Sequence, residues 1–159
     1  MKTAVVYYSY DGNCAFVAEQ IKVQLDADVV RLKSVKEKRH RGFAKIFWGV
    51  LQVATKKKPE LKPYSFDSSA CDLIILGTPV WAGSPAPAIR SFLSNTKISG
   101  KKLALFVCHG GGKGEAIDKL KSLLTGNTIV SEIDFLNPAK ENPEEQKKKI
   151  EDWVKTING

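Results

Sequence analysis

Residues 5–21 read VVYYSYDGNCAFVAEQI, and this stretch decides the fold. A short apolar run ends at Ser9, a turn rich in polar residues and glycine follows, and an amphipathic pattern then begins. The apolar run is typical of a strand buried on both faces, and the later pattern is typical of a helix. We therefore expect a strand over residues 3–8 that passes through a tight turn into a helix over residues 12–25.

The same alternation of strands and helices continues along the chain. Four further strands are expected at residues 28–32, 73–77, 103–108 and 128–135. Further helices are expected over residues 42–58, after Pro85, over residues 115–124 and after Pro143. Ser84 followed by Pro85 has the pattern of an N-cap with proline at the first helical position.

Strands that alternate with helices predict an α/β fold, a doubly wound parallel sheet with helices on both faces. The strands at residues 3–8, 73–77 and 103–108 are apolar throughout, so we expect them at the centre. The two more polar strands are expected at the edges, which gives five parallel strands in the order 2-1-3-4-5. Ligands of such sheets bind beyond the carboxyl ends of the strands. That rule brings three loops into one crevice, at residues 9–14, 78–84 and 108–114.

Basic residues gather in one segment. Residues 31–62 hold eleven Lys or Arg and two acids, a net charge of +9, whereas the rest of the chain carries −1. We treat residues 34–64 as a basic insertion within a single domain spanning residues 1–159. Its apolar residues recur at helical spacing, and we expect this stripe to face the core: Phe43, Phe47, Val50, Leu51 and Ala54. Nucleic-acid or lipid binding is then not expected, and docking of an acidic partner through complementary charge is favoured.

Composition argues against several other classes. No apolar run approaches the roughly 18 to 20 residues of a membrane span, and the N-terminus lacks the features of a signal peptide. We therefore expect a cytoplasmic protein. The three cysteines, Cys14, Cys71 and Cys108, are widely spaced, and only His40 and His109 could join them as ligands. Neither a disulfide framework nor a metal site is expected.

The first of the three loops joins a buried strand directly to a helix. Backbone N–H groups at a helix N-terminus are unpaired and carry a positive partial charge, which suits a phosphate. Gly12 permits an unusual backbone angle, and Ser9 and Asn13 can donate further hydrogen bonds. The loop is therefore a candidate phosphate cradle. The alternative is a simple helix cap made by Asp11 or Asn13.

The other two loops could hold a flat ligand. Trp81, beside Gly83, could offer its face to a planar ring, or it could be tucked against the rim of the sheet. The sequence CHGGGKG at residues 108–114 contains three successive glycines, which let the backbone direct N–H groups at a ligand. His109 could bond a carbonyl of that ligand. This loop could also be merely flexible.

The three loops together resemble those of the flavodoxin family. YYSYDGNCAFVAEQI resembles its phosphate loop, LIILGTPVWAGSPAPAIRSFL its second flavin loop, and ALFVCHGGGKGEAIDKL its third. The resemblance covers nearly the whole chain and implies a flavodoxin-like fold, bound FMN and electron transfer. It implies that the FMN phosphate is surrounded by Ser9, Tyr10, Asp11, Gly12, Asn13 and Cys14. It implies that the isoalloxazine ring is flanked by Thr78, Pro79, Val80, Trp81, Ala82 and Gly83, with Cys108, His109, Gly110, Gly111 and Gly112 on its other side.

Three residues depart from the family pattern. Asp11 stands where a hydroxyl residue is usual and would repel a phosphate unless its carboxylate points away. Cys14 replaces the last hydroxyl residue and is a weaker donor. The third loop lacks the tyrosine that stacks on the outer flavin face, so Trp48 or Phe47 could cover that face, or it could be open to a substrate.

Other functions remain open or are excluded by motif. An NAD(P)H-dependent FMN or quinone reductase could use the same fold, and so could a binding module without a cofactor. The partner would be an acidic redox protein or a small-molecule electron acceptor, and the protein could be a monomer or a homodimer. A tyrosine phosphatase needs Cys-x5-Arg, but Gln20 and Gly114 occupy the arginine positions. A receiver domain needs an aspartate at the end of the third strand, where this chain has Gly77 or Thr78. The sequence GGGKGE matches neither the Walker A motif nor the G-x-G-x-x-G motif.

Overall fold

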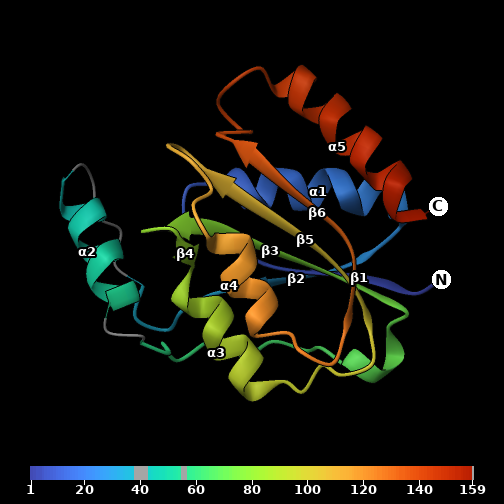
Figure 1. Ribbon diagram of the computed structural model, residues 1–159, viewed down its shortest axis with the longest axis horizontal. Helices are drawn as coiled ribbons and strands as arrows, with labels where there is room; N and C mark the ends of the chain where they lie inside the picture. Colours follow the sequence, from blue (N-terminus) through green and yellow to red (C-terminus); the bar gives the residue numbers. More distant parts are fainter. Residues whose placement is uncertain (38–42, 55–56, 159) are drawn as a thin grey trace.

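The computed structural model describes residues 1–37, 43–54 and 57–158. Its main sheet has five parallel strands in the order β2-β1-β3-β5-β6. These strands are β1 (Thr3–Tyr8), β2 (Asp28–Leu32), β3 (Leu73–Trp81), β5 (Lys102–His109) and β6 (Thr128–Leu136). The order is the 2-1-3-4-5 order predicted from strand polarity, with the short antiparallel strand β4 (Ser84–Pro85) added beside β3 (Figure 1).

The burial of each strand explains its place in the sheet. Every residue of β1 is buried, and β3 and β5 are buried along most of their length. The edge strands β2 and β6 consist mostly of exposed and half-buried residues, and each has one buried residue, Leu32 and Phe135. Close packing also fixes one position inside β3: a Cβ added to Gly77 would lie 2.0 Å from the Phe106 ring.

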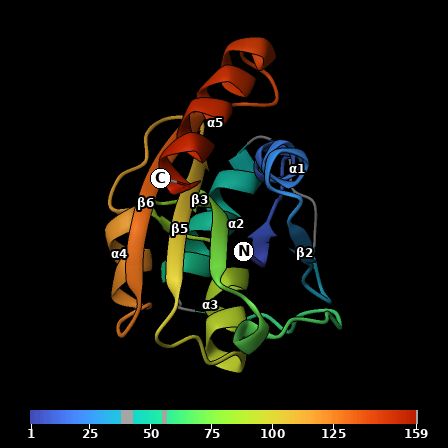
Figure 2. The same ribbon diagram turned by 90° about the vertical axis from the view of Figure 1, so that its right-hand side faces the viewer.

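Helices cover both faces of the sheet. Figure 2 shows α1 (Asn13–Leu25) and α5 (Pro143–Asn158) on one face, and α3 (Pro87–Asn95) and α4 (Ala116–Ser122) on the other. The first face buries one core cluster, which includes Ile21 and Trp153. The second buries another, which includes Phe92. The fold is therefore the flavodoxin-like α/β arrangement that the sequence predicts.

A β-hairpin replaces most of the loop predicted at residues 78–84. β3 continues as far as Trp81 and then turns back into β4 through Ala82 and Gly83, whose φ angles are 49° and 68°. Two successive positive φ angles are characteristic of the tightest hairpin turns. The prediction that Ser84 caps the next helix is therefore wrong, because Ser84 lies in β4 and the N-cap of α3 is Ala86.

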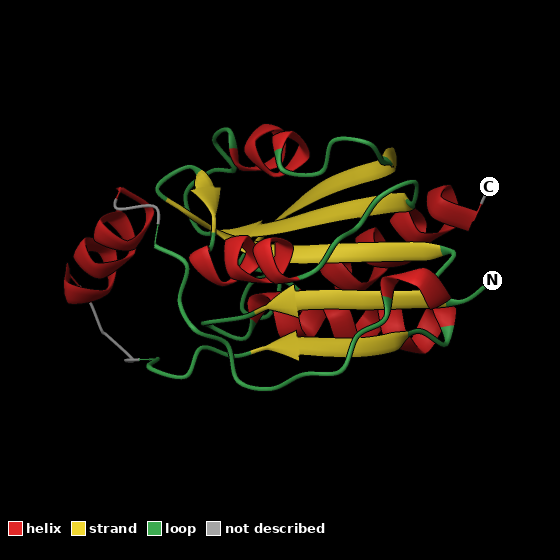
Figure 3. Ribbon diagram, turned by 90° about the horizontal axis from the view of Figure 1, so that it is seen from below, coloured by secondary structure: helices red, strands yellow, loops and turns green. Residues whose placement is uncertain are grey.

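Helix α2 (Phe43–Ala54) lies apart from the two helical layers, as Figure 3 shows. The prediction that its apolar stripe faces the core is wrong. Of its residues, Phe47 is 71% exposed and Val50 and Leu51 are 47% and 43% exposed, and the burial of Phe43 and Ala54 lies outside what the structure describes. The helix instead turns Gly49, which is buried, toward Trp81 at the end of β3. The predicted helix extended over residues 42–58, of which residues 42, 55 and 56 lie outside the described part.

The remaining short elements connect the sheet to its flanks. A 3₁₀ turn over Ser68–Ala70 precedes β3 and is capped by Asp67, which accepts a hydrogen bond from the Ser69 N–H at 2.9 Å. An isolated bridge joins Ser34 to Leu61, at the two ends of the segment that carries α2. Among the helices of the described residues, none is both long enough and apolar enough to cross a bilayer.

Candidate functional site

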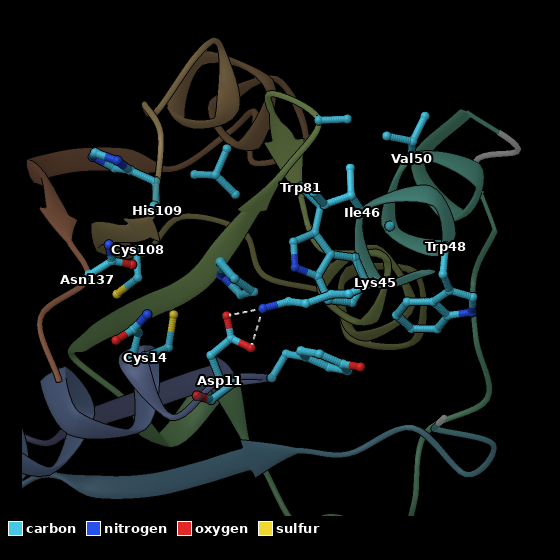
Figure 4. A pocket seen from close by; sticks show the side chains of 18 of the residues that line it. Asp11, Cys14, Lys45, Ile46, Trp48, Val50, Trp81, Cys108, His109 and Asn137 are labelled. Carbon is cyan, nitrogen blue, oxygen red and sulfur yellow. Dashed lines mark hydrogen bonds and ion pairs between the residues drawn. The ribbon is translucent and has the colours of Figure 1, made fainter. Parts of the chain in front are cut away.

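A pocket of about 390 Å³ opens beyond the carboxyl ends of β1, β3 and β5 (Figure 4). Its size lies in the range typical of small-molecule sites. Twelve of the seventeen residues predicted for the site line it: Ser9, Tyr10, Asp11, Asn13, Cys14, Pro79, Val80, Trp81, Ala82, Cys108, His109 and Gly110. The predicted loops therefore do meet in one place.

The other five predicted residues do not line this pocket. Thr78 is fully buried, and its hydroxyl accepts a hydrogen bond from the Ala86 N–H at 2.9 Å, which closes the β3–β4 hairpin. Gly12 is the N-cap of α1 with φ 90°, and Gly83 lies in the hairpin turn. Gly111 and Gly112 are exposed in the third loop. Their contribution is to the shape of the loops.

The first loop presents the N-terminus of α1 to the pocket. The Ser9 hydroxyl accepts a hydrogen bond from the Ala15 N–H at 3.2 Å, and the Asn13 side chain accepts one from the Ala139 N–H at 3.2 Å. The N-cap residue of the helix, Gly12, has no side chain that could cap it, and the first turn contains no acidic residue. The alternative that Asp11 or Asn13 serves simply as a helix cap is therefore wrong. The N-terminal amides retain the positive partial charge that attracts anions.

Asp11 is paired with a lysine from the basic insertion. The Lys45 Nζ lies 2.6 and 2.7 Å from the two carboxylate oxygens of Asp11, and both side chains are about one-third exposed (Figure 4). Lys45 also lies over the ring of Tyr10, 5.4 Å from its centroid. This pair joins α2 to the first loop and neutralises the carboxylate that departs from the family pattern.

Three aromatic rings gather around Trp81. Tyr8, Tyr10 and Trp48 each approach Trp81 edge to face, with ring centroids 5.8, 5.6 and 5.2 Å away. Tyr10 and Trp48 stack on each other at 6.0 Å. Burial raises the pKa of Tyr8, and a hydrogen bond to Glu37 raises it further, so its phenol stays protonated. Trp81 is therefore held in a cluster that forms one wall of the pocket.

His109 anchors the third loop. Its Nδ1 accepts a hydrogen bond from the Gly112 N–H at 3.0 Å, and its Nε2 lies 2.8 Å from the Asp134 carboxylate. These partners define a neutral ring that donates from Nε2. Because both ring nitrogens are engaged, the bond to a ligand carbonyl that the sequence suggested would require one of them to be released. Part of the third loop is thus fixed by a network rather than flexible.

Comparisons with known proteins identify the fold family. A sequence model described as flavodoxin matches residues 2–157. The chain belongs to the flavodoxin family. No match was found among curated protein sequences.

Solved flavodoxin-like structures resemble the chain over nearly its full length. A flavoprotein from Lactobacillus acidophilus in complex with FMN shares 22% identity, with a TM-score of 0.74 over 96% of this chain and 97% of that one. A two-electron reduced flavodoxin from Megasphaera elsdenii shares 24% identity, with a TM-score of 0.59 over 96% and 98%. An oxidised Flavodoxin 2 from Bacillus cereus shares 21%, with a TM-score of 0.61 over 99% and 98%.

Seven pocket residues of this flavodoxin-family chain were not among the predicted site residues: Lys45, Ile46, Trp48, Gly49, Val50, Asn137 and Lys140. Five belong to α2 and two to the connection between β6 and α5. The sequence did suggest that Trp48 could cover a flavin face, because it is an aromatic residue in the insertion. Nothing local marks Asn137, whose contact with the third loop is a backbone hydrogen bond from its N–H to the His109 carbonyl at 2.9 Å.

The two cysteines at the flavodoxin pocket lie together in its floor. Cys14 and Cys108 are 1% and 2% exposed and belong to the same core cluster. Burial raises the pKa of the Cys14 thiol well above its usual range, and a hydrogen bond with Cys108 raises it further. The Cys14 thiol therefore acts as a weak hydrogen-bonding group rather than as a thiolate. Within the described residues, no group of His, Cys, Asp and Glu could hold a metal ion.

Proposed function

We propose that this flavodoxin-family protein binds FMN in the pocket and transfers electrons through it. The observation that supports the proposal most directly is the convergence of the three loops on one pocket beside the N-terminus of α1, whose N-cap is glycine. The similar Lactobacillus acidophilus flavoprotein was solved in complex with FMN. Fold similarity alone does not define a reaction, so the proposal depends on how the pocket residues fit each part of the cofactor.

The N-terminal end of α1 fits the phosphate of FMN. The Ser9 hydroxyl accepts a hydrogen bond from the Ala15 N–H of its first turn. The N-cap, Gly12, has no side chain to cap the preceding amides and no Cβ to obstruct close approach. The Asn13 side chain is fixed by the Ala139 N–H, so it is oriented before a ligand arrives. The Asp11 carboxylate would oppose a dianion, but its pairing with Lys45 offsets that charge.

The aromatic wall fits the ring system of the flavin. Trp81, Trp48 and Tyr10 line the pocket from one side, and Val80 and Ile46 add apolar surface. Ring stacking and burial of apolar area are the usual means by which proteins hold flat cofactors. Gly110 has no side chain, so the third loop does not fill the pocket where it borders it. These residues would hold the flavin and exclude water from it.

The cofactor supplies the redox chemistry, and the chain supplies position and electrostatics. No acid or base from the protein is required when electrons move singly. The nearest charged groups are Lys45, Asp11 and Lys140, which line the pocket. Positive groups near a flavin favour its anionic reduced form, so Lys45 and Lys140 raise the reduction potential and Asp11 lowers it.

Titration of the purified apoprotein with FMN, followed by flavin fluorescence, tests cofactor binding. We expect strong quenching with a dissociation constant in the micromolar range or tighter, and riboflavin should bind more weakly because it lacks the phosphate. Unchanged flavin emission would contradict the proposal and favour a binding module without a cofactor.

Steady-state oxidation of NADPH or NADH by the FMN-loaded protein then separates an electron carrier from an enzyme. A carrier should show no steady-state oxidation of NADPH or NADH with a quinone as acceptor, and should exchange electrons with a redox protein. Rapid NAD(P)H oxidation would instead show a flavin or quinone reductase, the alternative that the sequence left open.

The basic insertion is the proposed docking surface for the redox partner. The described residues of this insertion include five basic side chains against Glu37 and Glu60: Lys36, Lys45, Lys57, Lys58 and Lys62. Helix α2 brings part of this charge to the pocket edge. Complementary charge speeds association and is screened by salt. We therefore expect electron exchange with an acidic protein to slow as ionic strength rises.

A further inference from the structure

The floor of the pocket contains two thiols that the proposed electron transfer does not use. Cys14 is in the first turn of α1, and Cys108 is the next-to-last residue of β5. These elements are far apart in sequence, yet both residues line the pocket and belong to the same core cluster. Figure 4 shows the two sulfur atoms turned toward one another, below His109 and Asn137.

The third cysteine, Cys71, differs from this pair in its position and in its hydrogen-bond partner. Cys71 lies at the opposite end of the sheet, just before β3, and packs in the other core cluster. Its thiol donates to the Asp67 carbonyl at 3.4 Å. Cys71 is also buried, at 5% exposure, so burial alone does not distinguish it from the pair. It is therefore a matched control for any chemistry assigned to Cys14 and Cys108.

We propose that Cys14 and Cys108 are an oxidisable dithiol that forms an intramolecular disulfide in the floor of the pocket. Two neighbouring thiols that face each other can be joined by side-chain rotation with a small backbone adjustment, since a disulfide tolerates a range of Cα separations. Both residues line the pocket, so a small oxidant reaches the pair through it.

Hydrogen peroxide is an oxidant of suitable size. The sulfur of one cysteine gives up its proton and attacks a peroxide oxygen; the O–O bond breaks, the released hydroxide takes up the proton, and a sulfenic acid and one water form. The sulfur of the second cysteine then attacks the sulfenic sulfur and, with its own proton, displaces the hydroxyl group as a second water. The two thiols lose two electrons and two protons, which the peroxide receives.

The disulfide would join the first turn of α1 to the end of β5, across the position of β3. Both residues belong to the lining of the proposed flavin site, so FMN bound there would cover them. This last expectation rests on the proposed function, whereas formation of the disulfide does not. We therefore expect FMN to slow the oxidation.

Oxidation of the purified apoprotein with hydrogen peroxide, followed by thiol counting under denaturing conditions and peptide mass mapping, tests the proposal. We expect two of the three thiols to be lost, with Cys71 still alkylated and one cross-linked peptide pair containing Cys14 and Cys108. Dithiothreitol should restore both. Cys71→Ser should still form the cross-link, and both Cys14→Ser and Cys108→Ser should abolish it.

Separate sulfinic acids, unreacted thiols or a disulfide between two molecules would each overturn the proposal. The wild-type measurement does not depend on whether a serine variant folds. In the FMN-saturated protein, with occupancy verified from the flavin spectrum, an unchanged oxidation rate would contradict the placement of the pair beneath the cofactor. Failure of FMN to bind at all would contradict the proposed function and leave the apoprotein result to decide the dithiol separately.

Discussion

At the scale of single residues, the pairing of Asp11 with Lys45 answers a question that the sequence raised. A carboxylate in a phosphate loop is unfavourable on its own, yet a lysine 34 positions away lies 2.6 Å from it. An exposed pair of this kind contributes only about 0 to 1 kcal/mol to folding. Its importance lies in the charge that FMN would meet. The pair should therefore affect cofactor affinity more than stability.

A double-mutant cycle on Lys45→Met and Asp11→Asn separates these effects. We expect Lys45→Met to weaken FMN binding about tenfold, or about 1.4 kcal/mol, because the Asp11 carboxylate is left unpaired near the phosphate. The double variant should bind FMN more tightly than Lys45→Met alone. Fluorescence titration provides the affinities, and urea unfolding checks stability. If the double variant and Lys45→Met bind equally, Asp11 does not act on the phosphate.

His109 and Asp134 give the stability of the protein a defined dependence on pH. Burial alone would raise the pKa of Asp134, but the hydrogen bond from His109 and the positive charges of Lys113 and Lys149 outweigh it, so the pKa is lowered. A carboxylate whose pKa is lower in the folded state stabilises the protein above its unfolded pKa. That contribution is lost as pH falls through the lowered value, below the ordinary 3.8.

Replacing Asp134 by Asn should therefore have a pH-dependent cost. At pH 7 we expect a loss of up to about 1 kcal/mol in the free energy of unfolding, because the side chain is partly exposed and screened. Below the lowered pKa the variant and the wild type should be equally stable. Urea unfolding across this pH range measures the difference, with Glu19→Gln as an exposed control. A difference that stays constant with pH would exclude the carboxylate as its source.

At the scale of elements, the sequence predicts the location of a strand better than the residue at which it ends. The strand at residues 73–77 was predicted from its apolar run, but β3 continues to Trp81. Thr78 and Pro79 resemble loop residues, yet β5 pairs with both of them. Proline is tolerated there because β1 pairs with β3 only as far as Gly77, so no strand on that side requires its missing N–H. Such pairing depends on a neighbour distant in sequence.

Helix α2 shows a second limit of sequence analysis. Periodicity predicted a helix correctly, but it could not show what the apolar stripe faces. Phe47, Val50 and Leu51 of this stripe are exposed. The helix residues that line the pocket include Lys45 and Trp48, which no spacing rule singled out. Site residues that come from an insertion are therefore harder to predict than those in loops that directly follow strands.

Matched Phe→Ala substitutions test the exposure of α2. Phe47 is 71% exposed and Phe92 is fully buried. We expect Phe47→Ala to change the free energy of unfolding by less than about 0.5 kcal/mol, as for surface substitutions in general. Phe92→Ala should cost about 3 to 5 kcal/mol through lost burial and a cavity. A loss above about 2 kcal/mol for Phe47→Ala would place its ring in the core after all.

At the scale of the whole molecule, strand polarity was enough to predict the sheet order. The order decides which loops meet, and twelve predicted residues accordingly lie around one pocket. Pocket contacts from other parts of the chain could not be predicted. Asn137, for example, is held beside the third loop by a hydrogen bond from its backbone N–H to the His109 carbonyl, which no side-chain pattern reveals. The same topology ties the pocket to the core, since α1 packs on α5 and on the sheet.

This connection predicts that FMN stabilises the entire fold. A ligand that binds only the native state at 100 times its dissociation constant adds about 2.7 kcal/mol to the free energy of unfolding. For a chain of this size that corresponds to a rise of about 5 to 10 °C in the melting temperature. Because α1 carries the proposed phosphate site and is part of the core, the transition should remain single and cooperative. Thermal unfolding followed by circular dichroism measures the shift, with riboflavin at the same concentration as the comparison. Riboflavin should give a smaller rise, since it cannot use the amides at the start of α1, and equal shifts for the two ligands would show that those amides do not hold the phosphate.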